Sequence, residues 1–296
     1  MGKIKYLDFA MIENTLMKYM LVEASKSFRL INIFKSALPF VLLFFVFAFK
    51  SDNFIIERRV YAKGNFFTAD NLGNFYLVGK DEISKYDANG NVFNKFSIKA
   101  FGNIESIDVS NPMKILVFYK DFSKIVFLDN TLSLNGSMID LEENMLNQSR
   151  LACYSYNDGI WVYDQQKFEL LRLDKNLSVS NNTGNLNQLL GIDIVPDFLT
   201  EYNNCIYLNN PSTGILVFDV YGTYLKTIPL LHLRKFQISN QEILYIEDSA
   251  AVSYNLTTKE ISRTFLPPNK YSECRRIKGL LYAKNEDYVD MLKPVK

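Results

Sequence analysis

Apolar and aromatic residues between positions 68 and 98 alternate with turn residues in a pattern that predicts three short strands. The strand patterns are Phe75–Val78, Ile83–Tyr86 and a more polar run over 92–98. Asn, Asp and Gly separate them, as in the sequence DANG at positions 87–90. Short β-branched and aromatic runs between such residues are typical of an antiparallel meander.

The same unit recurs along the chain with a period of about 40 residues, the length of a four-stranded propeller blade. One marker is a large residue in the second strand of each unit: Tyr76, Leu116, Trp161, Tyr207, Tyr245 and Tyr282. A second marker is the polar residue that ends the third strand: Asp87, Asp129, Asp174, Asp219 and Asn255. Asp and Asn at these places close tight turns, which is their expected role; calcium binding would require more oxygen ligands in one loop.

The last unit has only three strand patterns, Cys274–Ile277, Leu280–Lys284 and Tyr288–Leu292, whereas Phe54–Tyr61 has no neighbouring partner. An N-terminal strand that completes the last blade would close a ring and remove an open sheet edge. The sequence therefore predicts an all-β, six-bladed β-propeller over about residues 54–293. An open solenoid is the alternative topology, but it would need polar caps, and neither end is polar.

The run DNLGNFYLVGKDEISKYDANGNVFNKFSI at 70–98 resembles the NHL-like six-bladed propeller repeats of bacterial exported proteins. Their pattern is Asp-x-x-Gly-Asn followed by a hydrophobic-Tyr-hydrophobic strand, then a strand that ends in Tyr/Phe-Asp and a Gly-containing turn. Residues 219–228 repeat the later half of this pattern. The resemblance implies a fold and not an activity, because the motif consists of turn and core residues.

An apolar run, Ala37–Phe49, follows Lys26, Arg29 and Lys35 and is typical of a signal-peptide h-region or a signal anchor. We accordingly divide the chain into a signal or anchor region, 1–50, and a propeller, 51–296. The expected location is outside the cytoplasm, in the periplasm or cell envelope, with possible attachment to the membrane through this segment.

Three alternatives for this region remain open. The run lacks a small-x-small cleavage site, so the segment is either cleaved after a later start at Met17 or Met20 or retained as an anchor. A buried core helix is the third alternative.

Composition excludes several kinds of partner and site. The 33 Lys and Arg residues nearly balance the 32 Asp and Glu residues, which argues against nucleic acid as a partner. The one histidine, His232, cannot supply a two-His metal site, and we expect it in a linker between units. The three cysteines (Cys153, Cys205 and Cys274) lack metal-ligand spacing and are expected to be small buried hydrophobes.

Polar residues on the predicted innermost strands are the candidates for an axial site. These strands include Ile104–Val109 and Cys274–Ile277, and the candidates on them are Glu105, Asp108 and Arg275. Some six-bladed propellers are lactonases or sugar dehydrogenases with metal ligands around the axis. The recurring set of acids and Asn that such a site needs is missing here, so we expect no catalytic residue, metal or cofactor.

The repeat is interrupted at Val179–Pro196, which we expect to be a loop that leaves and rejoins one face of the ring. Insertions between blades often bind partners. The candidate contact residues are Asn181, Asn182, Asn185, Leu189, Leu190 and Ile192. The alternative is an elaborated connection without a role.

Two classes of function remain. The preferred hypothesis is a non-enzymatic, exported propeller that serves as a scaffold for a protein partner at a membrane. The alternative is a hydrolase, lactonase or sugar dehydrogenase with an axial metal site. The presence of several acids or Asn around one axial ion would distinguish the second class from the first.

Overall fold

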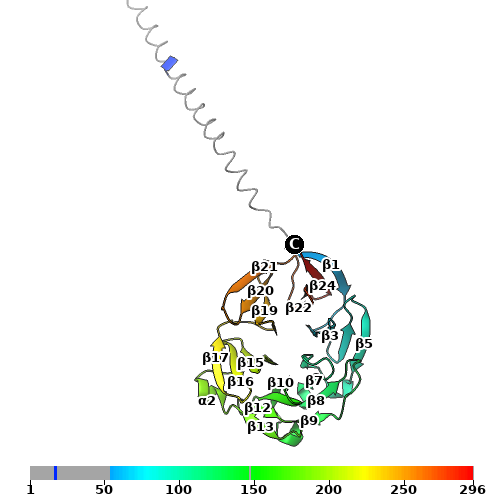
Figure 1. The fold of residues 1–296 in the computed structure, drawn as a ribbon, viewed down its shortest axis with the longest axis vertical. Coiled ribbons are helices and arrows are strands. Elements are labelled where there is room, and N and C mark those ends of the chain that lie inside the picture. The colour runs from blue at the N-terminus through cyan, green and yellow to red at the C-terminus, as the bar shows by residue number, and fades with distance from the viewer. Residues whose placement is uncertain (1–16, 19–53, 147, 296) are drawn as a thin grey trace, which may run out of the picture. The chain divides into compact units, whose positions relative to one another are not determined.

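A computed structural model describes residues 17–18, 54–146 and 148–295, and residues 54–295 form a ring of six four-stranded antiparallel sheets (Figure 1). The predicted six-bladed propeller is therefore confirmed. The apolar run Ala37–Phe49 lies outside the described residues, so its role as a signal or anchor, and the division of the chain at residue 50, stay predictions. Within the described residues, no helix has the length and apolar character needed to cross a membrane.

Each blade is a meander whose strands run from the axis outwards. The first blade comprises β2 (Phe66–Ala69), β3 (Phe75–Val78), β4 (Glu82–Tyr86) and β5 (Val92–Ser97), and the second comprises β6 (Ser106–Asp108), β7 (Ile115–Tyr119), β8 (Lys124–Leu128) and β9 (Ile139–Asp140). The third blade comprises β10 (Ser149–Ser155), β11 (Gly159–Asp164), β12 (Glu169–Leu173) and β13 (Val179–Asn182), and the fourth comprises β14 (Phe198–Tyr202), β15 (Cys205–Asn210), β16 (Gly214–Asp219) and β17 (Tyr224–Ile228). The fifth blade comprises β18 (Gln237–Ser239), β19 (Glu242–Glu247), β20 (Ala250–Asn255) and β21 (Ile261–Phe265).

The sixth blade joins the two ends of the described ring. It comprises β22 (Glu273–Ile277), β23 (Leu280–Lys284), β24 (Tyr288–Pro294) and, outermost, β1 (Phe54–Tyr61). Strand β1 pairs antiparallel with β24 from Phe54 opposite Pro294 to Tyr61 opposite Tyr288. The predicted closure by Phe54–Tyr61 is therefore confirmed.

Within residues 54–146 and 148–295, short helices occur in connections between strands: the 3-10 turns η1 (Lys99–Phe101), η2 (Lys120–Phe122) and η3 (Glu142–Asn144), and helix α2 (Leu186–Leu190). All six blades have the same meander order. The connection that leads into each innermost strand therefore lies on the same face of the ring as the connection between the second and third strands of each blade. We call this the α2 face, because it includes the connection that carries α2.

Six buried apolar clusters fill the ring, one between each pair of neighbouring blades. Five second-strand markers contribute to the cluster shared with the following blade: Tyr76, Leu116, Trp161, Tyr207 and Tyr282. In the fifth blade Tyr245 instead packs towards the preceding blade, and Leu244 takes the equivalent place. The assignment of Tyr245 as the repeat position is wrong by one residue, which in a strand reverses the face.

The polar markers at the ends of the third strands have the predicted turn-closing role. One side-chain oxygen of each accepts backbone N–H groups: Asp87 from Asn89 and Asn91, Asp129 from Thr131 and Ser133, Asp174 from Asn176 and Ser178, Asp219 from Tyr221 and Thr223, and Asn255 from Thr257 and Thr258. At each turn, the side-chain oxygen thus accepts the backbone N–H groups that have no partner in a neighbouring strand.

An ion pair reinforces the closure of the ring. Arg59 on β1 donates from Nε and Nη2 to the two carboxylate oxygens of Asp290 on β24, at 2.6 and 2.7 Å. Asp290 is fully buried and also accepts a hydrogen bond from the hydroxyl of Tyr271. The pair joins strands that are 231 residues apart in the sequence.

Replacing Arg59 by Met should lower the free energy of unfolding by about 2–4 kcal/mol, because a buried carboxylate loses its charged partner. Denaturant unfolding followed by fluorescence measures the change. The matched control is Arg263→Met, which removes an exposed ion pair with Glu247 in the fifth blade and should cost about 0–1 kcal/mol. Equal losses for the two variants would contradict a special role for the closing pair.

Deleting residues 51–62 should destabilise the whole propeller, because β24 then becomes an open edge and its buried Asp290 loses its partner. Melting of the truncated chain at the temperature of the intact one would contradict this closure.

Candidate functional site

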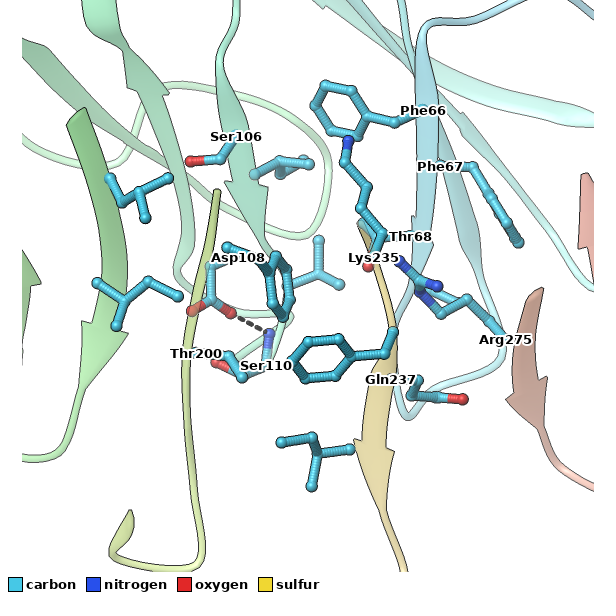
Figure 2. A pocket seen from close by; sticks show the side chains of 18 of the residues that line it. Phe66, Phe67, Thr68, Ser106, Asp108, Ser110, Thr200, Lys235, Gln237 and Arg275 are labelled. Atoms are coloured by element: carbon cyan, nitrogen blue, oxygen red, sulfur yellow. Dashed lines mark hydrogen bonds between the residues drawn. The ribbon is translucent and has the colours of Figure 1, made fainter. Parts of the chain in front are cut away.

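A pocket of about 240 Å³ lies at the axis of the ring, and the innermost strands of all six blades, with the residues that precede them, form its wall (Figure 2). Its apolar lining includes four phenylalanines: Phe66, Phe67, Phe198 and Phe236. Its charged side chains are Glu105, Asp108, Asp197, Lys235 and Arg275. Strand order thus brings together residues up to 209 positions apart, from Phe66 to Arg275.

Asp108, one of the predicted axial residues, joins two blades. Its two oxygens accept hydrogen bonds from the backbone N–H groups of Ser110 and Tyr154, each at 2.9 Å. Gln237 occupies the equivalent place in the fifth blade, since Asp108 lies opposite Leu116 and Gln237 lies opposite Leu244. Gln237 bonds the backbone N–H and carbonyl of Arg276 in the next blade.

Arg275, the second predicted residue, is buried in the pocket wall. Its Nη1 donates to the carbonyl of Cys274 at 2.7 Å, and its Nη2 lies 3.6 Å from Oε2 of Glu273. The guanidinium lies over the ring of Phe67, with Cζ 5.4 Å from the ring centroid. Glu105, the third predicted residue, is exposed at the pocket and precedes β6.

Lys235 was not among the residues predicted from the sequence, and it has the most strongly perturbed charge in the pocket. Its amino group lies 3.5 Å from the centroid of the Phe66 ring (Figure 2), and no hydrogen bond or ion pair of this group occurs among the described residues. The pKa of Lys235 is lowered to about 8, chiefly by burial and also by the positive charge of Arg275, while the negative charges of Glu273, Glu105 and Asp197 oppose the shift.

No distinct sequence signal marks Lys235. Two residues before the equivalent innermost position, the six blades carry Phe66, Ser106, Leu151, Phe198, Lys235 and Glu273. This series mixes apolar and polar residues, so a lysine in it does not stand out, and the series itself emerges only from the strand register.

Asp197, unlike Lys235, has a hydrogen-bond partner. Its Oδ1 accepts a hydrogen bond from Asn209 at 2.6 Å, and burial raises the pKa of its carboxyl group despite this bond. Within the part of the chain that the structure describes, no group of three or more His, Cys, Asp or Glu side chains is placed to hold a metal ion. The pocket instead mixes acids with Lys235 and Arg275, which does not fit an axial metal centre.

The expected loop Val179–Pro196 requires a correction. Val179–Asn182 is β13, the outermost strand of the third blade, in which Asn182 and Asn181 pair with Leu171 and Arg172. The fourth-strand pattern was missed because this outer strand is polar and has no apolar alternation. The true insertion therefore spans 183–197.

The insertion is firmly attached to the ring. The Asn185 side chain caps α2 by accepting from the N–H of Gln188, and Leu186 and Ile194 are buried in the cluster between the third and fourth blades. Leu190 and Ile192 pack partly against the same cluster. Of the predicted contact residues, Leu189 is the apolar one that remains exposed, at 55 %.

Leu189, Val195 and Leu231 are exposed on the α2 face, and we refer to them as the α2 patch. The backbone N–H of Val195 donates to the side chain of Asn210, and that of His232 donates to the carbonyl of Pro211. The connections 183–197 and 229–236 thus both contact the turn between β15 and β16. His232 lies in the linker between the fourth and fifth blades, as predicted.

The cysteines form no disulfide: Cys153 and Cys274 are buried, as predicted, and Cys205 is half-buried. Trp161 is buried in the core, and its indole N–H donates to Oε2 of Glu201 at 3.0 Å.

Replacing Lys235 by Met should stabilise the protein at pH 7. The folded pKa of about 8 lies below the usual 10.5, so the charged form opposes folding below pH 8 and this penalty disappears as the pH rises from 8 to 10.5. We expect a gain on the order of 1 kcal/mol at pH 7 that shrinks towards pH 10, measured by denaturant unfolding at each pH. A constant difference across this range would contradict the buried, unpaired state of the amine.

No protein-family model matches the chain, and no curated protein matches its sequence. Among solved structures, a gluconolactonase from Xanthomonas campestris aligns over 83 % of this chain and 96 % of its own, at 11 % identity and a TM-score of 0.55. BamB from Moraxella catarrhalis aligns over 81 % and 99 %, at 11 % identity and a TM-score of 0.51.

A catalytically inactive virginiamycin B lyase from Staphylococcus aureus, crystallised with quinupristin, aligns over 77 % of this chain and 80 % of its own, at 10 % identity and a TM-score of 0.52. These proteins are β-propellers, and at such identities the likeness shows the fold alone. The chain is thus a six-bladed β-propeller that resembles the NHL-like repeat proteins at the level of fold.

Proposed function

We propose that this protein is a non-enzymatic binding propeller that holds a protein partner through the α2 patch on its α2 face. The observation that carries the proposal is the anchored insertion 183–197. Buried Leu186 and Ile194 fix its position, while Leu189 and Val195 point to solvent with exposed fractions of 55 % and 59 %. Side chains held in place before binding lose less entropy when a partner docks.

Hydrogen bonds make the insertion rigid at several points. The hydroxyl of Tyr163 donates to the carbonyl of Ile194, and Nε of Arg150 donates to the carbonyl of Pro196. An elaborated connection without a role would not need exposed apolar residues on such a frame. Leu231, at 50 % exposure, is a further exposed apolar residue on the neighbouring connection.

The enzymatic alternative receives less support from the axial pocket. A lactonase-like metal site requires several oxygen ligands around one ion. Both oxygens of Asp108 already accept backbone N–H groups, and Lys235 and Arg275 lie in the same pocket. We therefore assign no catalytic residue and no metal.

We further propose that the protein acts in the cell envelope and that the run Ala37–Phe49 brings it to the membrane. The basis is the apolar run after Lys26, Arg29 and Lys35 in the sequence. Cell fractionation tests this part separately, and full-length protein in the cytosol would contradict it.

The double variant Leu189→Asp/Val195→Asp should capture the partner at least tenfold more weakly than the native protein while its melting temperature changes little, because both side chains are exposed. A tenfold loss corresponds to about 1.4 kcal/mol, which is the scale expected when a carboxylate without a partner is placed in an apolar contact. Copurification from detergent extracts of the producing cells, quantified against the native protein, measures the effect.

The matched control is Leu134→Asp, which places the same charge at a leucine of 58 % exposure in the connection between β8 and β9, on the opposite face. It should leave capture unchanged. Retention of every partner by the folded double variant would exclude the α2 patch, and turnover of a lactone or sugar by the purified protein would exclude the non-enzymatic class.

A further inference from the structure

The axial pocket contains a cation that lacks an acceptor. Each of the pocket's other buried or half-buried charges has a partner: Asp108 has two backbone donors, Asp197 has Asn209, and Arg275 has the carbonyl of Cys274 and nearby Glu273. The amino group of Lys235 has only the face of the Phe66 ring within the described residues. Lys235 is half-buried, and an ammonium group that has lost part of its hydration without gaining an oxygen acceptor is destabilising unless a ligand supplies one.

The charged and apolar groups around Lys235 indicate which kind of ligand the pocket would accept. Glu273 and Arg275 face it from β22, and Glu105 and Asp197 face it from the connections into β6 and β14. Glu105 is exposed to water, so it remains hydrated instead of filling the pocket. The wall also includes Phe66, Phe198 and aliphatic residues, so the pocket combines the amino group of Lys235 with apolar surface.

We propose that the axial pocket binds a small organic monocarboxylate, with its carboxylate group at the amino group of Lys235 and its apolar body against Phe66 and Phe198. The volume of about 240 Å³ suits a compact molecule and not a polymer. Charge-assisted hydrogen bonds from Lys and Arg to a carboxylate are stronger than neutral ones, and apolar walls increase their strength.

This inference is independent of the protein partner proposed above. The two regions share the connections 183–197 and 229–236, but the residues of the α2 patch (Leu189, Val195 and Leu231) do not line the pocket. The variant Leu189→Asp/Val195→Asp should therefore bind the carboxylate as the native protein does. Failure of one proposal thus leaves the other intact.

The test uses benzoate, phenylacetate and hexanoate as probes, with benzamide as the neutral and benzamidine as the cationic analogue of benzoate. Isothermal titration calorimetry at pH 7, in a buffer free of carboxylates, should show one saturable site for at least one carboxylate. Benzamide and benzamidine should bind at least tenfold more weakly than benzoate or not at all. Tighter binding of benzamidine, or no saturation by any carboxylate up to about 10 mM, would overturn the proposal.

Two variants locate the site. Lys235→Met, which should fold at least as stably as the native protein, should lose at least tenfold in carboxylate affinity. Glu105→Gln should bind the carboxylate more tightly at pH 6, where Lys235 stays protonated without the support of Glu105, because a negative charge near the anion is removed. Unchanged affinity of Lys235→Met would exclude this pocket. Weaker binding by Glu105→Gln would show that Glu105 assists the ligand, contrary to the proposed charge arrangement.

The pH dependence gives a second readout. Carboxylate affinity should fall as the pH rises from 7 to 10, because Lys235 loses the proton on which the anion depends, and Lys235→Met should abolish this dependence. A pH-independent affinity in the native protein would contradict the role of Lys235.

Discussion

Closure of the ring is the constraint on which the rest of the structure depends. Each blade buries its faces against two neighbours, so six apolar clusters form only if the first and last blades meet. Strand β1 meets this requirement by pairing with β24 and by placing Arg59 against the buried carboxylate of Asp290. The N-terminal end of the described ring thereby completes the blade that the C-terminal end leaves unfinished.

The axial pocket follows directly from closure. Six innermost strands that converge on one axis cannot fill it with backbone, so the space takes its character from whichever side chains occupy equivalent positions. Here the side chains at these positions differ from blade to blade. Aromatic rings line part of the wall, Asp108 and Gln237 form hydrogen bonds to neighbouring blades, and Lys235 has no hydrogen-bond acceptor among the described residues. A protein that keeps an unpaired amine in such a place gives up stability, which is common at binding sites.

The two proposed binding regions differ in how they arise. The α2 patch comes from an interruption of the repeat, where the insertion 183–197 is anchored by Leu186 and Ile194. The pocket comes from the repeat itself, through the convergence of equivalent strands. The α2 patch consists of exposed side chains on a connection, whereas the pocket lies at the centre of the ring. Substitutions at Leu189 or Val195 therefore leave the residues that line the pocket unchanged.

The sequence alone determined the period, the number of blades and the closing strand, because turn residues and short apolar runs act locally and recur. It also determined the role of residues such as Asp87 and Asp219, since a side chain that closes its own turn needs no distant partner. It failed where registers matter: Tyr245 was placed one residue out of phase, and the polar strand β13 was taken for a loop.

Tertiary structure alone decided which charges meet. Glu105, Asp108 and Arg275 were predicted as axial from the patterns of the innermost strands, yet the bond of Asp108 to Tyr154 in the next blade, and the isolation of Lys235, depend on contacts between blades. Such contacts join residues tens to hundreds of positions apart. No local pattern in the chain specifies them, because they arise only once the ring has closed.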